Sequence, residues 1–180
     1  MKIVNMNTLT EHQLTQAAQM LTDELPIGWP TLADAIYEIK EEWQDTSGAV
    51  FIAALDDDEV VGWTGILPRY DGRVFELHPL VVRRDQQRKG VGAMLVNKIA
   101  DIAREKGGLT LWLGADDEEN GGETSLANVD LYDNLPQHIQ DFDPGTHQSA
   151  FYMKLGFKVV GVMPDANGIG RPDIYMAKRL

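Results

Sequence analysis

Cysteine is absent from this chain of 180 residues. Its absence excludes disulfide bonds, a cysteine nucleophile and any metal site with thiolate ligands. Long apolar runs are absent as well, and the first residues, MKIVNMN, lack the hydrophobic stretch of a signal peptide. We therefore expect a cytoplasmic protein without a membrane span. A chain of this length is typical of a single domain, predicted here over residues 1–180.

Positive charge is scarce, with 16 Lys and Arg residues against 28 Asp and Glu residues and a net charge of −12. Such a chain repels nucleic acids and anionic membranes in general and attracts cationic partners. Basic residues nevertheless concentrate between Arg83 and Lys89, in the order RRDQQRK. This local cluster indicates a small anionic ligand, with a solvated basic loop as the alternative.

Hydrophobic periodicity predicts an α/β fold with one mixed sheet, because strands and helices do not alternate regularly. Thr10 and Gln13 have the pattern of a capping box at the start of the first helix, and Thr31 can cap the second. Residues 109–113 are almost wholly apolar and are expected to form a strand buried on both faces. The expected strands are residues 2–6, 50–55, 60–67, 74–82, 109–113, 157–163 and 173–177, and the expected helices are residues 10–24, 31–39, 90–106, 126–135 and 148–155.

The predicted strand at 74–82 carries residues with a chemical use. Glu76 and His78 share one face because they are two positions apart, and either side chain can accept a proton. Pro79 removes a hydrogen-bond donor and predicts a bulge or a splayed strand, along which an extended ligand can pair. The N–H of Leu80 would then be free to bind the oxyanion of an acyl transfer. The alternatives are a surface acid for Glu76 and a structural histidine for His78.

A glycine-containing loop follows this strand, with the spacing Q-x-x-G-x-G from Gln87 to Gly92. Glycine lets the backbone approach a diphosphate, and a helix N-terminus supplies unpaired N–H groups and partial positive charge. Arg88 and Lys89 add charge. A dinucleotide fingerprint would need a third glycine where Leu95 stands, and the Gly-Lys-Ser/Thr of a Walker loop is missing. The loop therefore predicts a diphosphate site of another kind, with a simple turn as the alternative.

Acidic residues follow the apolar strand at 109–113. Asp116, Asp117 and Glu118 come where α/β sheets bind ligands, outside the C-terminal ends of strands. They could bind a polycationic substrate, and a solvated loop is the alternative. A calcium loop is not indicated, because the D-x-D-x-D-G spacing is missing, and we expect no metal. The same two interpretations, acceptor cleft or solvated face, apply to the acidic side of the second helix, which carries Glu38, Glu41 and Glu42.

The expected sheet order and the Q-x-x-G-x-G loop together resemble the GCN5-related N-acetyltransferase (GNAT) superfamily. Most of the chain after Val60 is similar to one branch of it, the aminoglycoside 6'-N-acetyltransferases of the enterococcal type. The N-terminal helices match this branch only in layout. The similar segments are GWTG at 62–65, ELHPLVV at 76–82, LGADD at 113–117, VDLY at 129–132, FYMKLGF at 151–157, VGVMPDANG at 160–168 and PDI at 172–174.

The resemblance implies a GNAT-like mixed sheet with a splayed central strand pair and flanking helices. It also implies acetyl-CoA as the donor, a primary amine as the acceptor and a homodimer. The base role falls on Glu76, acting through water with His78 beside it, and the oxyanion donor on the backbone of Leu80. The implied donor-binding residues are Leu80, Val81, Val82, Gln87, Arg88, Lys89, Gly90, Val91, Gly92 and Ala93.

The acid for the departing thiolate falls, by the same resemblance, on Tyr152. The alternative for Tyr152 is a core aromatic, although Phe151 is expected to fill that place. The implied acceptor is the 6'-amine of an aminoglycoside. Two other functions stay open: the same chemistry on a polyamine, a peptide or a protein lysine, and a CoA-binding protein without catalysis.

Overall fold

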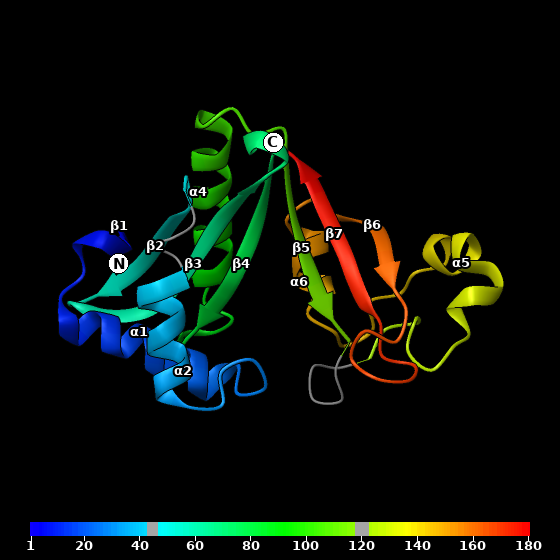
Figure 1. Cartoon of the computed structure of the whole chain (residues 1–180), viewed down its shortest axis with the longest axis horizontal. Helices are drawn as coiled ribbons and strands as arrows, with labels where there is room; N and C mark the ends of the chain where they lie inside the picture. The colour runs from blue at the N-terminus through cyan, green and yellow to red at the C-terminus, as the bar shows by residue number, and fades with distance from the viewer. Residues whose placement is uncertain (43–46, 118–122) are drawn as a thin grey trace. The chain divides into compact units, whose positions relative to one another are not determined.

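The computed structural model describes residues 1–42, 47–117 and 123–180. These residues form two compact units, Met1–Leu111 with Leu180 and Trp112–Arg179 (Figure 1). Both units contain helices and strands, which confirms the predicted α/β class, whereas a single domain over residues 1–180 stays a prediction. Over the described residues, no helix is long and apolar enough to cross a membrane.

The first unit is built on four antiparallel strands in the order β1-β2-β3-β4. One row across them pairs Val4 with Ala53, Ala53 with Trp63 and Trp63 with Val81, and all four side chains belong to or pack on one hydrophobic cluster. The elements are β1 (Lys2–Asn5), α1 (Glu11–Glu24), α2 (Leu32–Tyr37), the π-helical turn η2 (Glu38–Glu42), β2 (Val50–Asp56), β3 (Glu59–Arg69), β4 (Val74–Val82) and α4 (Val91–Glu105), with short 3-10 turns η1 (Met6–Thr8), η3 (Tyr70–Gly72) and η4 (Arg84–Gln86).

The first two helices begin at the predicted caps. The N–H of Gln13 donates to the Thr10 hydroxyl at 3.3 Å, and the N–H of Thr10 donates to Gln13 Oε1 at 3.0 Å. This reciprocal pair confirms the predicted capping box and satisfies N–H groups that the helix itself leaves unpaired. Thr31 and Asp34 form a second capping box at the start of α2.

Helices cover both faces of β3, which is buried through most of its length. Trp63 donates its Nε1–H to the carbonyl of Ala17 in α1 at 3.0 Å. Gly62 lies on the opposite face of the strand, where a Cβ would come 3.1 Å from Val91 Cγ1 of α4. Since successive strand residues face opposite sides, α1 and α4 cover opposite faces of β3. This double cover fixes β3, and with it the neighbouring strand β4.

The second unit holds most of β5 (Thr110–Asp116), with β7 (Asp173–Arg179) beside it and β6 (Lys158–Met163) at the edge. β6 and β7 are antiparallel. Ile174 and Met176 of β7 are fully buried, so β7 carries much of this unit's core. Its helices are α5 (Leu131–Gln140) and α6 (Ser149–Lys154).

The prediction that residues 109–113 are buried on both faces is wrong. Leu109 lies before the strand and is 61% exposed. Within β5, buried Leu111 and Leu113 alternate with half-buried Thr110 and Trp112. The apolar run misled because Trp112 is a large side chain on the less buried face, where it meets Tyr175 edge to face at 5.8 Å.

The helix expected at 126–135 begins later, at Leu131, and continues to Gln140. Its cap is Asp130, whose Oδ1 accepts the N–H of Tyr132 at 3.0 Å. An aspartate before an apolar residue is a good start signal, and it outweighs the helical propensity of the preceding turn. Pro136 lies inside α5, and Asn134 departs from helical geometry two residues before it.

Candidate active site

One face of β4 brings together the predicted catalytic residues of the first unit. Glu76, His78 and Leu80 are half-buried and alternate with buried residues along the strand. The predicted shared face of Glu76 and His78 is therefore confirmed. A polar side chain that is partly withdrawn from water but still reachable is suited to exchange a proton with a bound ligand.

A β-bulge interrupts the pairing of β3 with β4, as Pro79 predicts. Thr64 pairs with Leu80 and Ile66 with Leu77, so Gly65 alone faces two residues of β4. The buried Thr64 hydroxyl donates to the carbonyl of Pro79 at 2.8 Å and closes the bulge. A Cβ on Gly65 would overlap the Phe51 ring and lie 2.9 Å from the carbonyl oxygen of His78, so this close approach requires glycine. The splayed partner strand that the resemblance implies stays a prediction.

Glu76 is held by an arginine that the sequence did not indicate. Arg69 Nε donates to Glu76 Oε2 at 2.8 Å, and Arg69 Nη2 lies 2.8 Å from the same oxygen. The Glu76 side chain is 21% exposed. Because both contacts are made through Oε2, Oε1 is the oxygen that remains available to accept a proton. Arg69 is the last residue of β3 and pairs in register with Val74, which brings its side chain within reach of Glu76.

His78 lies against an acid and an indole from the N-terminal half of the chain. Its Nε2 is 3.7 Å from Glu38 Oε1. Trp29 packs its ring 5.8 Å from the imidazole, centroid to centroid, and donates its Nε1–H to Glu38 Oε2 at 3.3 Å. Glu38 is only 13% exposed, so the solvated-face interpretation does not hold for this residue. The side chains of Glu41 and Glu42 lie outside the described residues.

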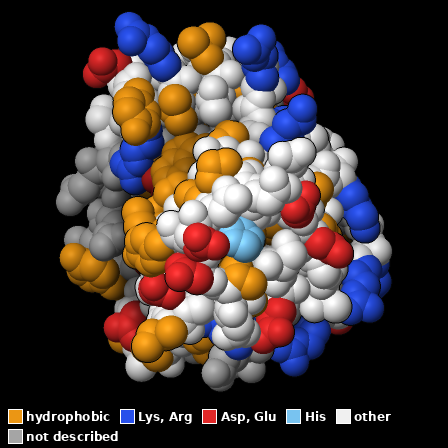
Figure 2. Space-filling model, turned by 90° about the vertical axis from the view of Figure 1, so that its right-hand side faces the viewer, with side chains coloured by type: hydrophobic (Ala, Val, Ile, Leu, Met, Phe, Trp, Pro, Cys, Tyr) orange, Lys and Arg blue, Asp and Glu red, His pale blue; other side chains and the backbone are white. Residues whose placement is uncertain are grey.

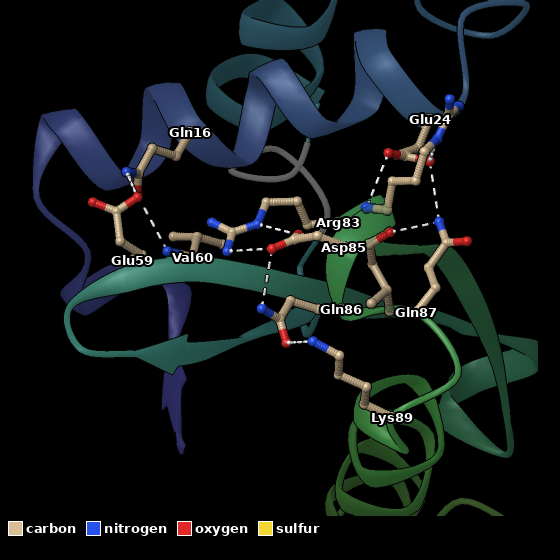
Figure 3. Close-up of polar contacts among 11 residues, drawn as sticks. Gln16, Glu24, Glu59, Val60, Arg83, Asp85, Gln86, Gln87 and Lys89 are labelled. Atoms are coloured by element: carbon tan, nitrogen blue, oxygen red, sulfur yellow. Dashed lines mark hydrogen bonds and ion pairs between the residues drawn. The ribbon is translucent and has the colours of Figure 1, made fainter.

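The basic cluster that follows β4 is partly neutralised within the chain (Figure 3). Arg83 Nε donates to Asp85 Oδ1 at 2.7 Å, and this bond holds the pKa of the Asp85 carboxyl below its usual range. The Arg84 N–H donates to Glu24 Oε1 at 3.1 Å, and Arg84 Nε lies 3.6 Å from Glu24 Oε2. Of the four predicted cations, Arg88 and Lys89 are thus the two that could meet an anionic ligand.

Glu24, the last residue of α1, anchors this loop. Besides Arg84 it accepts a hydrogen bond from Gln87 Nε2 at 3.0 Å, and the same amide donates to the carbonyl of Val82 at 2.9 Å (Figure 3). Gln87, one of the predicted donor-binding residues, fastens the loop to β4 and α1 through its side chain, and its contact with the donor stays a prediction. A glutamate at the end of a helix carries no local signal for this role, because its partners lie some sixty positions away.

The N-terminus of α4 has the geometry of an anion site. Gly90 caps the helix in the left-handed region, with φ at 90°, and Arg88 precedes it with φ at 60°. The first helical hydrogen bond runs from Met94 N–H to the carbonyl of Gly90 at 3.0 Å. Among the described residues, the N–H groups of Val91, Gly92 and Ala93 make no hydrogen bond. Three free donors on a helix end capped by the exposed Gly90 fit a diphosphate.

Tyr152 belongs to the second unit and lies in its core. Tyr152 is 7% exposed, and its ring packs edge to face with those of Phe151 and Phe157, at centroid distances of 5.1 Å and 5.6 Å. Burial raises the pKa of the Tyr152 phenol above its ordinary value. The prediction that Phe151 fills the core in place of Tyr152 is wrong, since Phe151 is the less buried of the two.

The acidic residues after β5 divide into structural and exposed groups. Asp117 is fully buried, and its Oδ2 accepts from the Thr124 hydroxyl at 2.8 Å while Arg171 Nη1 approaches Oδ1 at 3.5 Å. Those contacts give Asp117 a structural role, and its predicted part in a substrate site stays a prediction. Asp116 is exposed and accepts from Asn167 Nδ2 at 2.8 Å. Glu118 lies outside the described residues.

Near Asp116 the structure adds residues that sequence reasoning missed. Asp173 of β7 lies over Gly114, where a Cβ would come within 2.8 Å of its Oδ2. Tyr175, two residues on, has a raised pKa, first because it is desolvated and then because Asp173 and Asp116 are close. Trp112 of β5 packs edge to face against the Tyr175 ring. Carboxylates beside aromatic rings are suited to hold an organic cation.

A cavity of about 360 Å³ opens elsewhere in the second unit, between the start of α5 and the segment 164–172. It is lined by Asp130, Tyr132, Asp165 and Ile169 among others. Both aspartates already accept backbone hydrogen bonds, Asp130 from Tyr132 and Asp165 from Gly170. Figure 2 shows the side of the molecule that carries α5, with acidic and hydrophobic side chains intermixed near its centre. Among the described residues, no group of acids and histidines could hold a metal ion.

Comparison with known proteins agrees with this geometry. Residues 14–127 match the model of the acetyltransferase (GNAT) family. The chain is 35% identical to an aminoglycoside 6'-N-acetyltransferase solved with coenzyme A, with a TM-score of 0.87 over 99% of this chain and 97% of that one. The enzyme of the same description from Enterococcus faecium is also 35% identical, with a TM-score of 0.86 and the same coverage of both chains.

A third solved structure, aminoglycoside 6'-acetyltransferase type Ii, is 32% identical with a TM-score of 0.76, over 99% of this chain and 97% of that one. A search of curated protein sequences gave no match. The similarity to the three structures extends over nearly the whole chain.

Proposed function

Because the chain belongs to the acetyltransferase (GNAT) family and is an acetyl-CoA-dependent N-acetyltransferase, we propose that its acceptor is the 6'-amine of an aminoglycoside. The observation that carries this proposal is the near-full-length similarity to three aminoglycoside 6'-N-acetyltransferases at 32–35% identity. The half-buried row of Glu76, His78 and Leu80, joined by η4 to the open end of α4, gives that similarity a chemical basis.

The donor is assigned to β4 and the loop after it. The adenosine diphosphate end of acetyl-CoA would be held by the N–H groups at 91–93, with Arg88 and Lys89 adding charge. Gln87 is assigned to the same site, and its side chain fastens the loop to β4 and α1. The pantetheine arm is extended and polar, and the backbone of Leu80, Val81 and Val82 is the proposed partner for it.

The chemical step needs a proton removed and a negative charge stabilised. The acceptor ammonium gives up a proton to Glu76 Oε1, directly or through water, because a protonated amine has no lone pair for attack. Its nitrogen then forms a bond to the thioester carbonyl carbon, and the Leu80 N–H is proposed to bind the resulting oxyanion. The carbon–sulfur bond breaks as the carbonyl re-forms, and the departing thiolate takes a proton from the group assigned as acid, Tyr152. The nitrogen, cationic after its attack, releases its second proton, which restores the Tyr152 phenol and leaves a neutral amide.

The acceptor is polycationic, and the acidic and aromatic residues of the second unit are suited to it. We assign its further ammonium groups to Asp116 together with Asp173, beside the rings of Trp112 and Tyr175. Asp117 has no part in this assignment. A homodimer and a cytoplasmic location are further proposals: the resemblance supports the first, and the absence of cysteine is compatible with the second.

A steady-state assay of CoA release tests the proposed acceptor. Kanamycin, spermidine and a lysine-containing peptide are offered separately at equal concentration with acetyl-CoA. We expect kanamycin to give the highest kcat/KM. A higher kcat/KM for spermidine or the peptide would replace the aminoglycoside by that class of amine. CoA binding without turnover of any amine would favour a non-catalytic CoA-binding protein.

A further inference from the structure

His78 lies against Glu38, a residue that has no part in the mechanism proposed above. The Glu38 carboxylate joins two partners from different segments. Its Oε1 lies 3.7 Å from His78 Nε2, and its Oε2 accepts the Trp29 Nε1–H at 3.3 Å. The side chain of Glu38 is 13% exposed, whereas that of His78 is 42% exposed. The acid is therefore the sheltered member of the pair, and the imidazole is the member that a ligand can reach.

Trp29 restrains the same imidazole from a second direction. Its ring centroid lies 5.8 Å from that of His78, with the two planes tilted by 47°. A single side chain thus contacts the imidazole with its ring and the carboxylate with its N–H. Rotation of the imidazole about its χ angles would disturb the contact with Trp29 as well as the approach to Glu38.

The backbone that carries Glu38 is unusual. Glu38 is the first residue of the π-helical turn η2, which follows α2 without a break. Isolated π-helical turns are rare, and they occur frequently at functional sites because the extra residue re-aims the side chains around it. The turn is tied to α1 by Lys40, whose Nζ lies 3.2 Å from Glu11 Oε2. The position of Glu38 is therefore fixed by α2, which precedes it, and by the contact of Lys40, which follows it.

We propose that Glu38 is a positioning residue for His78: it holds the neutral imidazole with its proton on Nε2, toward the carboxylate, so that Nδ1 carries the lone pair. This inference rests on the proposed acetyl transfer to an amine. The proton that Glu76 takes from the acceptor ammonium, as that N–H bond breaks, is passed on to Nδ1. The imidazolium formed keeps the Nε2 proton and faces the negative charge of Glu38. A carboxylate serves a histidine base in the same way in other enzymes.

The test measures the tautomer of His78 and the activity separately. In protein labelled with ¹⁵N-histidine, His78 is identified by comparison with His78→Gln, and its two ring nitrogens are recorded at alkaline pH, where imidazole is neutral. We expect wild type to hold the proton on Nε2. In Glu38→Gln the two tautomers should be mixed, since a carboxamide can donate as well as accept. We expect kcat/KM for the amine to fall roughly ten- to hundredfold, as for carboxylates that orient metal-bound histidines.

Two further variants separate positioning from general structure. Glu105→Gln removes an exposed carboxylate in the same unit, at the end of α4, and should change neither the His78 signals nor the rate. Trp29→Phe keeps a ring beside His78 and removes the donor to Glu38, so it should produce a smaller change of the same kind. It also replaces Glu38→Gln as the test if that variant does not fold.

Two results would overturn the inference. One is a His78 tautomer that is identical in wild type and Glu38→Gln. The other is an unchanged kcat/KM in Glu38→Gln with the amine that wild type acetylates. Failure of the proposed function would look different, because wild type would then acetylate no amine while the nitrogen signals could still be recorded on the free protein.

Discussion

At the scale of single residues, the candidate site depends on which atoms are already engaged. Arg69 binds one carboxylate oxygen of Glu76 and leaves the other available. Trp29 and Glu38 restrain His78. The carboxylate of Asp117 is bound by Thr124 and Arg171. Residue type and spacing predicted Glu76 and His78, but the partners that orient them come from other elements, β3 for Glu76 and the N-terminal segment for His78. Those partners decide whether a carboxylate serves chemistry or structure.

Replacing Glu76 by Gln should slow catalysis without weakening the binding of the donor. A carboxamide keeps the size of the side chain and cannot accept the ammonium proton, so we expect kcat at neutral pH to fall by about a hundredfold. The Kd of CoA, measured by calorimetry, should stay unchanged. Glu105→Gln, at the exposed end of α4, serves as the control. Equal activity of Glu76→Gln and wild type across the pH range would remove Glu76 from the base role.

Tyr152 gives a prediction about pH as well as rate. Its pKa is raised above the ordinary 10.0 by burial, so the folded protein holds the phenolic proton more tightly than the unfolded chain does. The stabilisation is complete below pH 10 and is lost as the pH rises further. Chemical denaturation should therefore show wild type losing stability above pH 10 more steeply than Tyr152→Phe. The same variant should lower kcat by up to about a hundredfold if Tyr152 is the acid, whereas an unchanged kcat would leave it a core residue.

The residues that could not be found from the sequence share a physical feature. Glu24, Arg69, Trp29 and Asp173 act through contacts formed only after folding, with partners up to 63 positions away. Local patterns carry no record of such contacts. Pro79 and Gly90 could be predicted, because each constrains the backbone at its own position whatever packs around it.

At the scale of elements, two backbone irregularities prepare the site. The bulge opposite Gly65 shifts the pairing of β4 at Pro79, and the left-handed Gly90 opens the end of α4. The capping box of α1, the Thr31 cap of α2 and the bounds of β4 were predictable, since each depends on neighbouring residues. The burial of β5 and the start of α5 were not, because they depend on Tyr175 and on the choice between competing helix starts.

Gly90→Val tests whether the end of α4 binds the donor. A β-branched side chain at positive φ costs about 1–2 kcal/mol of backbone strain, and it also blocks the approach of a diphosphate. Gly107→Val is the matched control, since Gly107 has φ at 88°, ends the same helix and likewise has open space around its Cβ position. We expect both variants to lose a similar free energy of unfolding in urea denaturation. Only Gly90→Val should lower the affinity for CoA measured by calorimetry. Equal CoA affinity in the two variants would make the loop purely structural.

At the scale of the whole molecule, charge and similarity indicate the same kind of acceptor. A net charge of −12 favours a cationic substrate, and the three solved structures that are 32–35% identical to the chain are described as aminoglycoside 6'-acetyltransferases. Net charge alone could not separate an aminoglycoside from a polyamine or a lysine-containing peptide. The near-complete coverage of the three structures supports the proposed aminoglycoside, because it includes the segments around Asp116 and Asp173 as well as the donor loop.

The most direct test of the proposed acceptor is the position of the acetyl group in the product. Kanamycin is incubated with the protein and acetyl-CoA, and the product is examined by two-dimensional NMR. We predict one acetyl group, on the 6'-nitrogen, and no reaction with an otherwise similar aminoglycoside that carries a hydroxyl at the 6' position. Acetylation at another nitrogen, or equal acetylation of the 6'-hydroxyl compound, would contradict the account.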